Sequence, residues 1–166
     1  FVREFALEAE KLGYDSIWYA DHLYFKNGDH LLECWTTLTG LAAITRRIRL
    51  GPLMTCNLFR YPSLLAKMAA TVDTISNGRL ELGIGAGWHK EECDAYGIPF
   101  PESKVRQARF IEALEILKKM WTEEQTSYGG RYYALREVEC WPKPVQKPHV
   151  PITIGGKGET VTPKLA

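Results

Sequence analysis

The strongest constraint on the fold of this chain is the regular recurrence of a short apolar segment followed by a helix-forming segment. Three apolar segments begin at Ser16, Ile48 and Arg79, so their starts lie 32 and 31 residues apart. Each has apolar residues on both faces, a pattern typical of strands in a parallel sheet covered by helices. A (β/α)8 barrel repeats its unit at this length, since about 250 residues form eight units. The sequence therefore predicts an α/β fold, the (β/α)8 TIM barrel.

The boundaries of the units can be placed from apolar periodicity and from residues that end helices. Phe1, Phe5, Ala9 and Leu12 share one face of a first helix, and Gly13 ends it. Further helices are predicted over 34–47, 63–76 and 102–121, and strands over 15–23, 48–55, 79–87 and 150–156. The face of the last helix that we expect to be buried consists of Ala108, Ile111, Leu114, Leu117 and Trp121.

Two segments interrupt the alternation, and the chain is expected to be part of a longer one. Gly129 and Gly130 predict a small hairpin, and the four prolines from Pro142 to Pro151 predict an extended surface loop. The chain opens inside a helical pattern, and another helix is expected to begin after Gly156, where the chain stops. We therefore expect residues 1–166 to be a fragment.

Charge and apolar content exclude several classes of partner. The formal net charge is +1, which gives no reason to expect nucleic acid or an anionic membrane as a partner. Apolar runs stay short of the roughly 18 residues of a membrane span, and the opening residues predict an amphipathic helix rather than a signal peptide. We expect a cytoplasmic protein that acts on a small-molecule substrate.

The four cysteines are far apart and include no C-x-x-C pair. This spacing favours isolated buried thiols in a reducing compartment over a disulfide framework or a zinc site. His89 and Cys93 lie four residues apart and could share a helical face, but two ligands make a poor metal site. We therefore expect no metal.

The segment "GRLELGIGAGWHKEE", residues 78–92, contains the glycines most suggestive of a ligand. Gly83, Gly85 and Gly87 give G-x-G-x-G, whereas the dinucleotide fingerprint G-x-G-x-x-G would need glycine in place of Trp88. Gly83 is expected to make room for packing. Gly85 and Gly87 fall where a barrel strand ends, at the face that carries active sites, and there glycine lets a flat ring or a phosphate approach the backbone.

Asp21 and His22 also close a predicted strand. A structural histidine is one explanation; the other is an imidazole that exchanges a proton with a substrate or a ring. Asp21 could orient this imidazole or anchor the loop. Thr55 and Asn57, at the end of the next strand, offer hydrogen-bonding groups, and Trp88 with His89 could line the same mouth.

Four segments together resemble one known superfamily. They are "DSIWYADHL", "RIRLGPLMTCNLFRYPSLLAKMAATVDTISNGRLELGIGAGW", "AYGIPFP" and "PVQKPHVPITIGG", in this order along nearly the whole chain. They closely resemble the bacterial luciferase-like monooxygenases, and within them the coenzyme F420-dependent oxidoreductases. The resemblance implies that residues 1–166 are the N-terminal half of one TIM barrel, truncated at both ends and containing strands two to five.

The resemblance also implies roles for particular residues. His22 matches the histidine that faces the reactive edge of the deazaflavin ring, and Asp21 precedes it, so both are assigned to catalysis. Leu53 and Met54 lie where many members have a non-prolyl cis peptide against the ring, and Gly155–Gly156 match a turn near the cofactor phosphate. The residues expected to bind the cofactor are Leu53, Met54, Thr55, Asn57, Gly85, Ala86, Gly87, Trp88, Gly155 and Gly156.

The expected function is hydride transfer between coenzyme F420 and a small organic substrate. The alternatives are an FMN-dependent monooxygenase of the same superfamily and a non-catalytic barrel subunit. Sugar-phosphate dehydrogenases of the superfamily carry an acidic proton donor directly after the glycine segment, where this chain has Trp88. This departure argues against a sugar phosphate as substrate. A homodimer is expected for the full-length protein.

Overall fold

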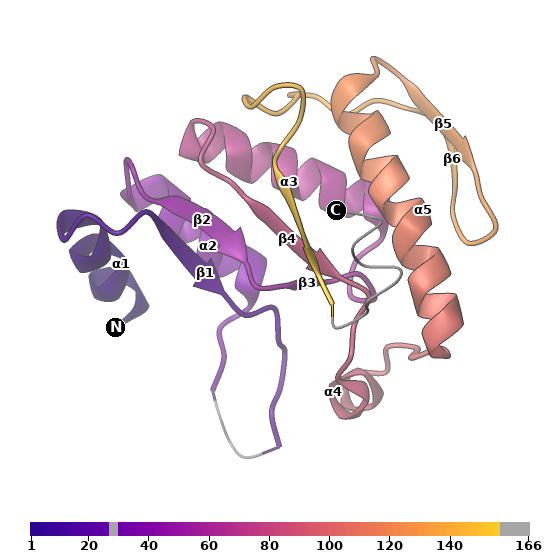
Figure 1. The fold of residues 1–166 in the computed structure, drawn as a ribbon, viewed down its shortest axis with the longest axis horizontal. Coiled ribbons are helices and arrows are strands. Elements are labelled where there is room, and N and C mark those ends of the chain that lie inside the picture. The colour runs from indigo at the N-terminus through magenta and orange to yellow at the C-terminus, as the bar shows by residue number, and fades with distance from the viewer. Residues whose placement is uncertain (27–29, 157–166) are drawn as a thin grey trace.

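The computed structural model describes residues 1–26 and 30–156 and has the predicted α/β architecture (Figure 1). Its helices are α1 (Val2–Lys11), α2 (Cys34–Ile44), α3 (Pro62–Ser76), α4 (Lys90–Ala95) and α5 (Ser103–Thr122). Its strands are β1 (Ser16–Tyr19), β2 (Arg49–Pro52), β3 (Thr55–Cys56), β4 (Leu82–Gly85), β5 (Thr126–Gly129), β6 (Ala134–Val138) and β7 (Ile152–Gly155). The helix expected after Gly156 lies outside the described residues.

The barrel-type strands pair in parallel and in chain order. β1 pairs with β2, β3 pairs with β4, and β4 pairs with β7. An isolated parallel bridge between Leu50 and Leu80 joins the two sheets that these pairs form. The strands all point toward the same end of the molecule, where the loop after β1 and helix α4 lie (Figure 1). The described residues thus form an open run of strands that does not close into a barrel.

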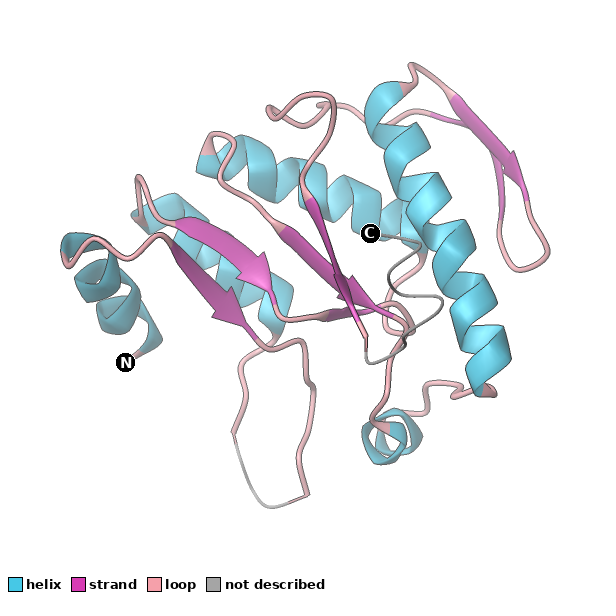
Figure 2. Ribbon diagram, in the orientation of Figure 1, coloured by secondary structure: helices cyan, strands magenta, loops and turns pink. Residues whose placement is uncertain are grey.

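The long helices lie side by side along one face of the strands (Figure 2). Leu82 and Ile84 of β4 are fully buried, as is Leu80 just before this strand. Small residues of α3, among them Ala66 and Ala69, are buried as well and allow close approach. The indole Nε1 of Trp121 in α5 donates to the carbonyl oxygen of Ala66 at 3.0 Å, which ties α5 to α3.

On the opposite face, large side chains lie over glycines of neighbouring strands. A Cβ added to Gly83 would lie 2.2 Å from the carbonyl oxygen of Pro52 and 2.6 Å from Sδ of Met54. A Cβ on Gly155 would lie 2.5 Å from Cγ of Met54. Glycine at these positions leaves the space that the Met54 side chain fills. The expectation that Gly83 makes room for packing is confirmed.

Residues at the ends of α2 and α3 explain locally where these helices start and where α3 stops. Pro62 occupies the first turn of α3, where its missing N–H removes no helical hydrogen bond. Asn77 follows the helix in the left-handed conformation, with φ 58°, and Gly78 continues it with φ 80°. Glu33 caps the start of α2, since its carboxylate accepts hydrogen bonds from Trp35 N and Thr36 N.

Two predicted helix faces were wrong in detail. At α1 the residues Phe1, Phe5 and Leu12 of the predicted face are 97%, 59% and 67% exposed, and the helix buries Ala9 of that face together with Ala6. The helix approaches its neighbours through small side chains, so a periodicity drawn through its largest residues misplaced the face. In α5 Ile111 is 37% exposed, whereas Phe110 is buried.

The predicted strands were too long, and one is divided. The segment 48–55 forms β2 and then the short strand β3, with the Leu53–Met54 peptide between them in the cis form. The predicted hairpin forms from β5 and β6. Helix α4 was not predicted, because six residues are too few to show a helical periodicity.

We predict that Gly83→Ala lowers the free energy of unfolding by about 1–3 kcal/mol, because the new methyl group would overlap a backbone oxygen. Gly40→Ala in α2 is the matched control, since a Cβ there meets nothing within 4 Å. The control should be more stable than the parent by about 0.5–1 kcal/mol, because alanine favours the helix. Urea denaturation of both variants measures these changes, and equal midpoints for the two would contradict the packing argument.

Candidate active site

The polar and aromatic groups singled out in the sequence gather at the carboxyl ends of the parallel strands. Asp21 and His22 follow β1, the Leu53–Met54 peptide follows β2, and Trp88 and His89 follow β4 just before α4. Because parallel strands end at one edge, segments far apart in the chain meet there. The strand ends and α4 lie together in the lower part of Figure 1.

The carboxylate of Asp21 is fully buried and holds two strand ends together. Its Oδ2 accepts from the backbone N–H of Cys56 at 2.9 Å and from Nη1 of Arg60 at 2.7 Å. Its Oδ1 accepts from Nη2 of Arg60 at 2.9 Å. Burial by itself would lower the pKa of Arg60, but its hydrogen bonds and charge interactions with Asp21 and Glu33 outweigh this effect and raise it. Of the two roles considered for Asp21, these contacts are those of an anchor for the loop.

His22 is held by a carboxylate that the sequence did not single out. Its Nδ1 lies 2.9 Å from Oε2 of Glu92, a residue of α4 that is 1% exposed. The other oxygen of Glu92 accepts from the backbone N–H of Tyr24 at 3.1 Å and from that of Leu23. One buried carboxylate therefore binds both the imidazole and the backbone that follows it.

Three aromatic rings surround the imidazole of His22. The ring centroid of Phe25 lies 4.5 Å from that of His22, and the indole of Trp88 meets it edge-on at 5.6 Å. His89 stacks on Trp88, with ring centroids 4.9 Å apart, and its ring lies 5.9 Å from that of His22. Trp88 is 70% exposed, so the apolar surroundings of His22 are open on that side.

His22, His89 and Glu92 bring possible metal-ligand atoms within 4.8 Å of one another. The sequence had paired His89 with Cys93 instead. This cluster contains Glu92 and not Cys93, whose thiol has its pKa raised by burial. Nδ1 of His89 lies 3.4 Å from Oε2 of Glu92 without hydrogen-bond geometry, whereas Nδ1 of His22 is hydrogen-bonded to this oxygen. The contacts that are formed are those of a hydrogen-bonded histidine–carboxylate pair.

The segment after β2 provides polar groups that are buried but not satisfied. The cis peptide between Leu53 and Met54 is present as predicted, and Leu53 is 52% exposed at the strand end. Oγ1 of Thr55 and both side-chain polar atoms of Asn57 are buried without a hydrogen-bond partner among the described residues. Buried polar groups are normally paired, so these atoms fit a site whose polar ligand completes their hydrogen bonds.

The glycines at the strand ends have packing reasons of their own. Gly87 has φ 89°, a conformation that side chains rarely adopt, and Ala86 beside it packs partly against the core. A Cβ on Gly85 would lie 3.3 Å from the carbonyl oxygen of Gly155. Gly156 is exposed directly after β7. A bulky residue at Gly85 would therefore disturb β7 as well as any ring bound there.

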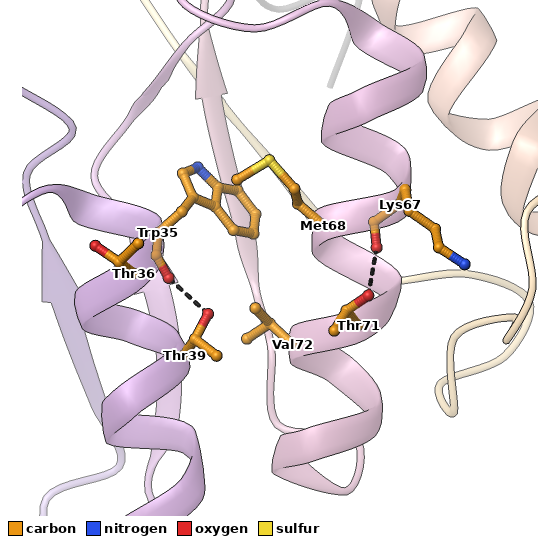
Figure 3. A pocket seen from close by; sticks show the side chains of 7 residues that line it. All are labelled: Trp35, Thr36, Thr39, Lys67, Met68, Thr71 and Val72. Carbon is orange, nitrogen blue, oxygen red and sulfur yellow. Dashed lines mark hydrogen bonds between the residues drawn. The ribbon is translucent and has the colours of Figure 1, made fainter.

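A hollow of about 200 Å³ lies elsewhere, between α2 and α3 (Figure 3). Its lining consists of Trp35, Thr36, Thr39, Lys67, Met68, Thr71 and Val72. The hydroxyls of Thr39 and Thr71 donate to carbonyl oxygens of their own helices, at 2.7 and 2.8 Å. The hollow belongs to the helical layer and is not part of the strand-end site.

Sequence reasoning missed Glu92, Arg60 and Phe25 at this site. Glu92 lies three residues after His89, a spacing that brings side chains together on a helix, but the helical spacing noted in this segment was that of His89 with Cys93. The buried carboxylate of Asp21 required a cation, yet several arginines of the chain were equally eligible. Only the fold brings Arg60 to it.

Comparisons with known families and proteins identify one family. A model of the family described as "luciferase-like monooxygenase" matches residues 1–166. The F420-dependent glucose-6-phosphate dehydrogenase of Kineococcus radiotolerans is 36% identical over 162 residues, which are 96% of this chain and 48% of that protein. The chain spans about half the length of the curated relatives it matches.

Solved structures agree on the fold. The crystal structure of monooxygenase RslO1 from Streptomyces bottropensis superposes with a TM-score of 0.83 at 30% identity, covering 92% of this chain and 46% of that one. An F420-dependent secondary alcohol dehydrogenase in complex with an F420–acetone adduct gives 0.82 at 27% identity, covering 92% and 47%. Among residues 1–26 and 30–156, no helix has the length and apolar character to cross a bilayer.

We predict that Asp21→Asn lowers the free energy of unfolding by about 3–5 kcal/mol, because it leaves the Arg60 guanidinium buried without its main partner. Asp15→Asn is the matched control, since Asp15 is exposed and precedes the same strand. Chemical denaturation of the full-length variants decides the point. An Asp21 variant as stable as the Asp15 variant would show that the ion pair does not hold the strand ends.

Proposed function

The chain belongs to the luciferase-like monooxygenase family of flavin- and deazaflavin-dependent oxidoreductases, and we propose that the full-length protein transfers hydride between coenzyme F420 and a small organic substrate. The observation that carries this proposal is the His22–Glu92 pair at the carboxyl ends of the parallel strands. An imidazole fixed at this edge is placed to move a proton at a substrate bound over the strand ends.

Several residues are suited to hold the cofactor. Thr55 and Asn57 have buried polar atoms without partners among the described residues, and Leu53 presents an exposed apolar side chain beside them. Gly87, shortly after β4, has no side chain that would block the approach of a ring to the backbone. We propose that these groups contact the deazaflavin and its polar substituents. When bound, a deazaflavin supplies an acceptor or donor of a hydride, which is two electrons with one proton.

His22 would accept the proton that the substrate hydroxyl loses. When an alcohol is oxidised to a carbonyl, its carbon loses a hydride and its hydroxyl loses a proton. Nδ1 of His22 faces Glu92, so the remaining nitrogen, Nε2, is the atom that would accept the hydroxyl proton and return it in the reverse reaction. The ring of Phe25 would cover one side of the imidazole, and the side next to the exposed Trp88 stays open to a substrate.

A small alcohol or the corresponding carbonyl compound is the substrate class that we propose. The solved F420-dependent secondary alcohol dehydrogenase, which resembles this chain at 27% identity, supports this class. The curated relatives include glucose-6-phosphate dehydrogenases, but this chain has Trp88 directly after its glycine segment, where the family resemblance implies an acidic proton donor in sugar-phosphate dehydrogenases. Glu92, the buried acid nearby, is already occupied by His22 and two backbone N–H groups.

An FMN-dependent monooxygenase is the second candidate. It is favoured by the similarity to monooxygenase RslO1, with a TM-score of 0.83 at 30% identity. The two candidates differ in the cofactor and in the need for oxygen, so cofactor binding separates them.

We predict that the full-length protein binds coenzyme F420 more tightly than FMN, by at least about tenfold in the dissociation constant, which corresponds to about 1.4 kcal/mol. Fluorescence titration of the protein with each cofactor measures this ratio. Tighter binding of FMN, together with oxygen consumption during turnover, would favour the monooxygenase. Binding of neither cofactor would favour a non-catalytic subunit.

We predict that His22→Ala lowers turnover by about 10²–10⁴-fold while the dissociation constant of the cofactor stays within a few-fold of the parent, because a general acid–base group contributes to the rate rather than to cofactor affinity. His149→Ala is the control, since His149 packs near Trp121, away from the strand-end site. Steady-state assays with simple secondary alcohols provide the measurement. Turnover of the His22 variant near that of the control would leave His22 a structural residue.

A further inference from the structure

The two oxygens of Glu92 have separate duties. Oε1 accepts from two successive backbone N–H groups, those of Leu23 and Tyr24. Oε2 lies 2.9 Å from Nδ1 of His22. The residue is 1% exposed, and water has little access to compete for these contacts. Because the backbone contacts fix Oε1, the carboxylate cannot exchange its oxygens without breaking them.

We propose that Glu92 is the positioning residue of the site and selects the tautomer of His22. A carboxylate only accepts hydrogen bonds, so Nδ1 of His22 must carry the proton that is shared with Oε2. In the neutral imidazole the other nitrogen, Nε2, is then unprotonated and able to accept a proton. The inference rests on the proposed function, in which His22 accepts a proton from the substrate.

Glu92 acts on the reaction only through His22. The same carboxylate fixes the backbone immediately after His22, so the orientation of the ring and the path of the loop are set together. From that loop, Phe25 packs against the imidazole of His22, and the two ring centroids lie 4.5 Å apart. The short helix α4, of six residues, thereby sets the orientation of an imidazole that follows β1.

Glu92→Gln tests the proposal because glutamine has the same shape and a predictable orientation. The two backbone N–H groups require an acceptor, so the amide oxygen would take the place of Oε1. The amide NH₂ group would then face Nδ1 of His22 and donate to it, which leaves the proton of the neutral ring on Nε2. A ring in this tautomer cannot accept the proton of the substrate at Nε2.

We expect Glu92→Gln in the full-length protein to lower turnover by about 10²–10⁴-fold, the range for loss of a correctly protonated general base. The dissociation constant of coenzyme F420 should stay within a few-fold of the parent. Glu91→Gln is the matched control: Glu91 is the neighbouring residue of α4 and is exposed, so its turnover should equal that of the parent.

The nitrogen-15 spectrum of labelled histidine gives a readout that a merely structural role would not move. At a pH where the imidazole is neutral, the parent and the Glu91 variant should show His22 protonated at Nδ1, and Glu92→Gln should show it protonated at Nε2. The parent spectrum alone already tests the proposal if the variant does not fold, since a parent protonated at Nε2 overturns it.

The outcomes separate this inference from the proposed function. If His22→Ala slows turnover but Glu92→Gln retains the tautomer and the turnover of the parent, the role of Glu92 is contradicted and that of His22 stands. If His22→Ala leaves turnover unchanged, the proton-transfer role of His22 fails, and with it the catalytic meaning of the tautomer.

Discussion

The buried carboxylate of Asp21 is the contact on which the strand-end site depends. It accepts three hydrogen bonds, one from the backbone of Cys56 after β2 and two from Arg60 in the loop before α3. Arg60 also pairs with Glu33, which caps α2. A single ion-pair network thus joins the ends of two strands to the starts of two helices. A buried carboxylate is stable only when it is paired, so these segments cannot separate without exposing an unpaired charge.

Asp21 and His22 are neighbours in the chain, yet each takes part in a different interaction with a carboxylate. The first is itself the acid and is neutralised by a guanidinium, which makes it an anchor. The second receives its acid, Glu92, from a helix 70 residues further along the chain. This arrangement keeps one carboxylate permanently paired and leaves the other to orient an imidazole. The end of β1 therefore combines a rigid ion pair, Asp21 with Arg60, with an imidazole, the type of side chain that can exchange protons near neutral pH.

The glycines in and after β4 are explained first by packing. Leu80, Leu82 and Ile84 are fully buried, while the glycines between and after them face the opposite side. There the Met54 side chain, which lies between β2 and β3, fills the space above Gly83 of β4 and Gly155 of β7. The spacing of these glycines had already excluded the dinucleotide fingerprint, and the space above Gly83 and Gly155 is taken up by the Met54 side chain.

The sequence by itself determined the repeated strand–helix unit, the parallel sheet, the ends of α3 and the position of His22 at a strand end, because these follow from local periodicity and from proline and glycine chemistry. It also identified Leu53–Met54 as a cis peptide through family resemblance. Tertiary structure alone decided which side chains meet: Arg60 with Asp21, Glu92 with His22, Met54 with two glycines. Such contacts join residues up to about a hundred positions apart, and local propensity carries no information about them. The inward face of α1 was decided in the same way, because packing against its neighbours favoured alanines over the larger residues that the periodicity had indicated.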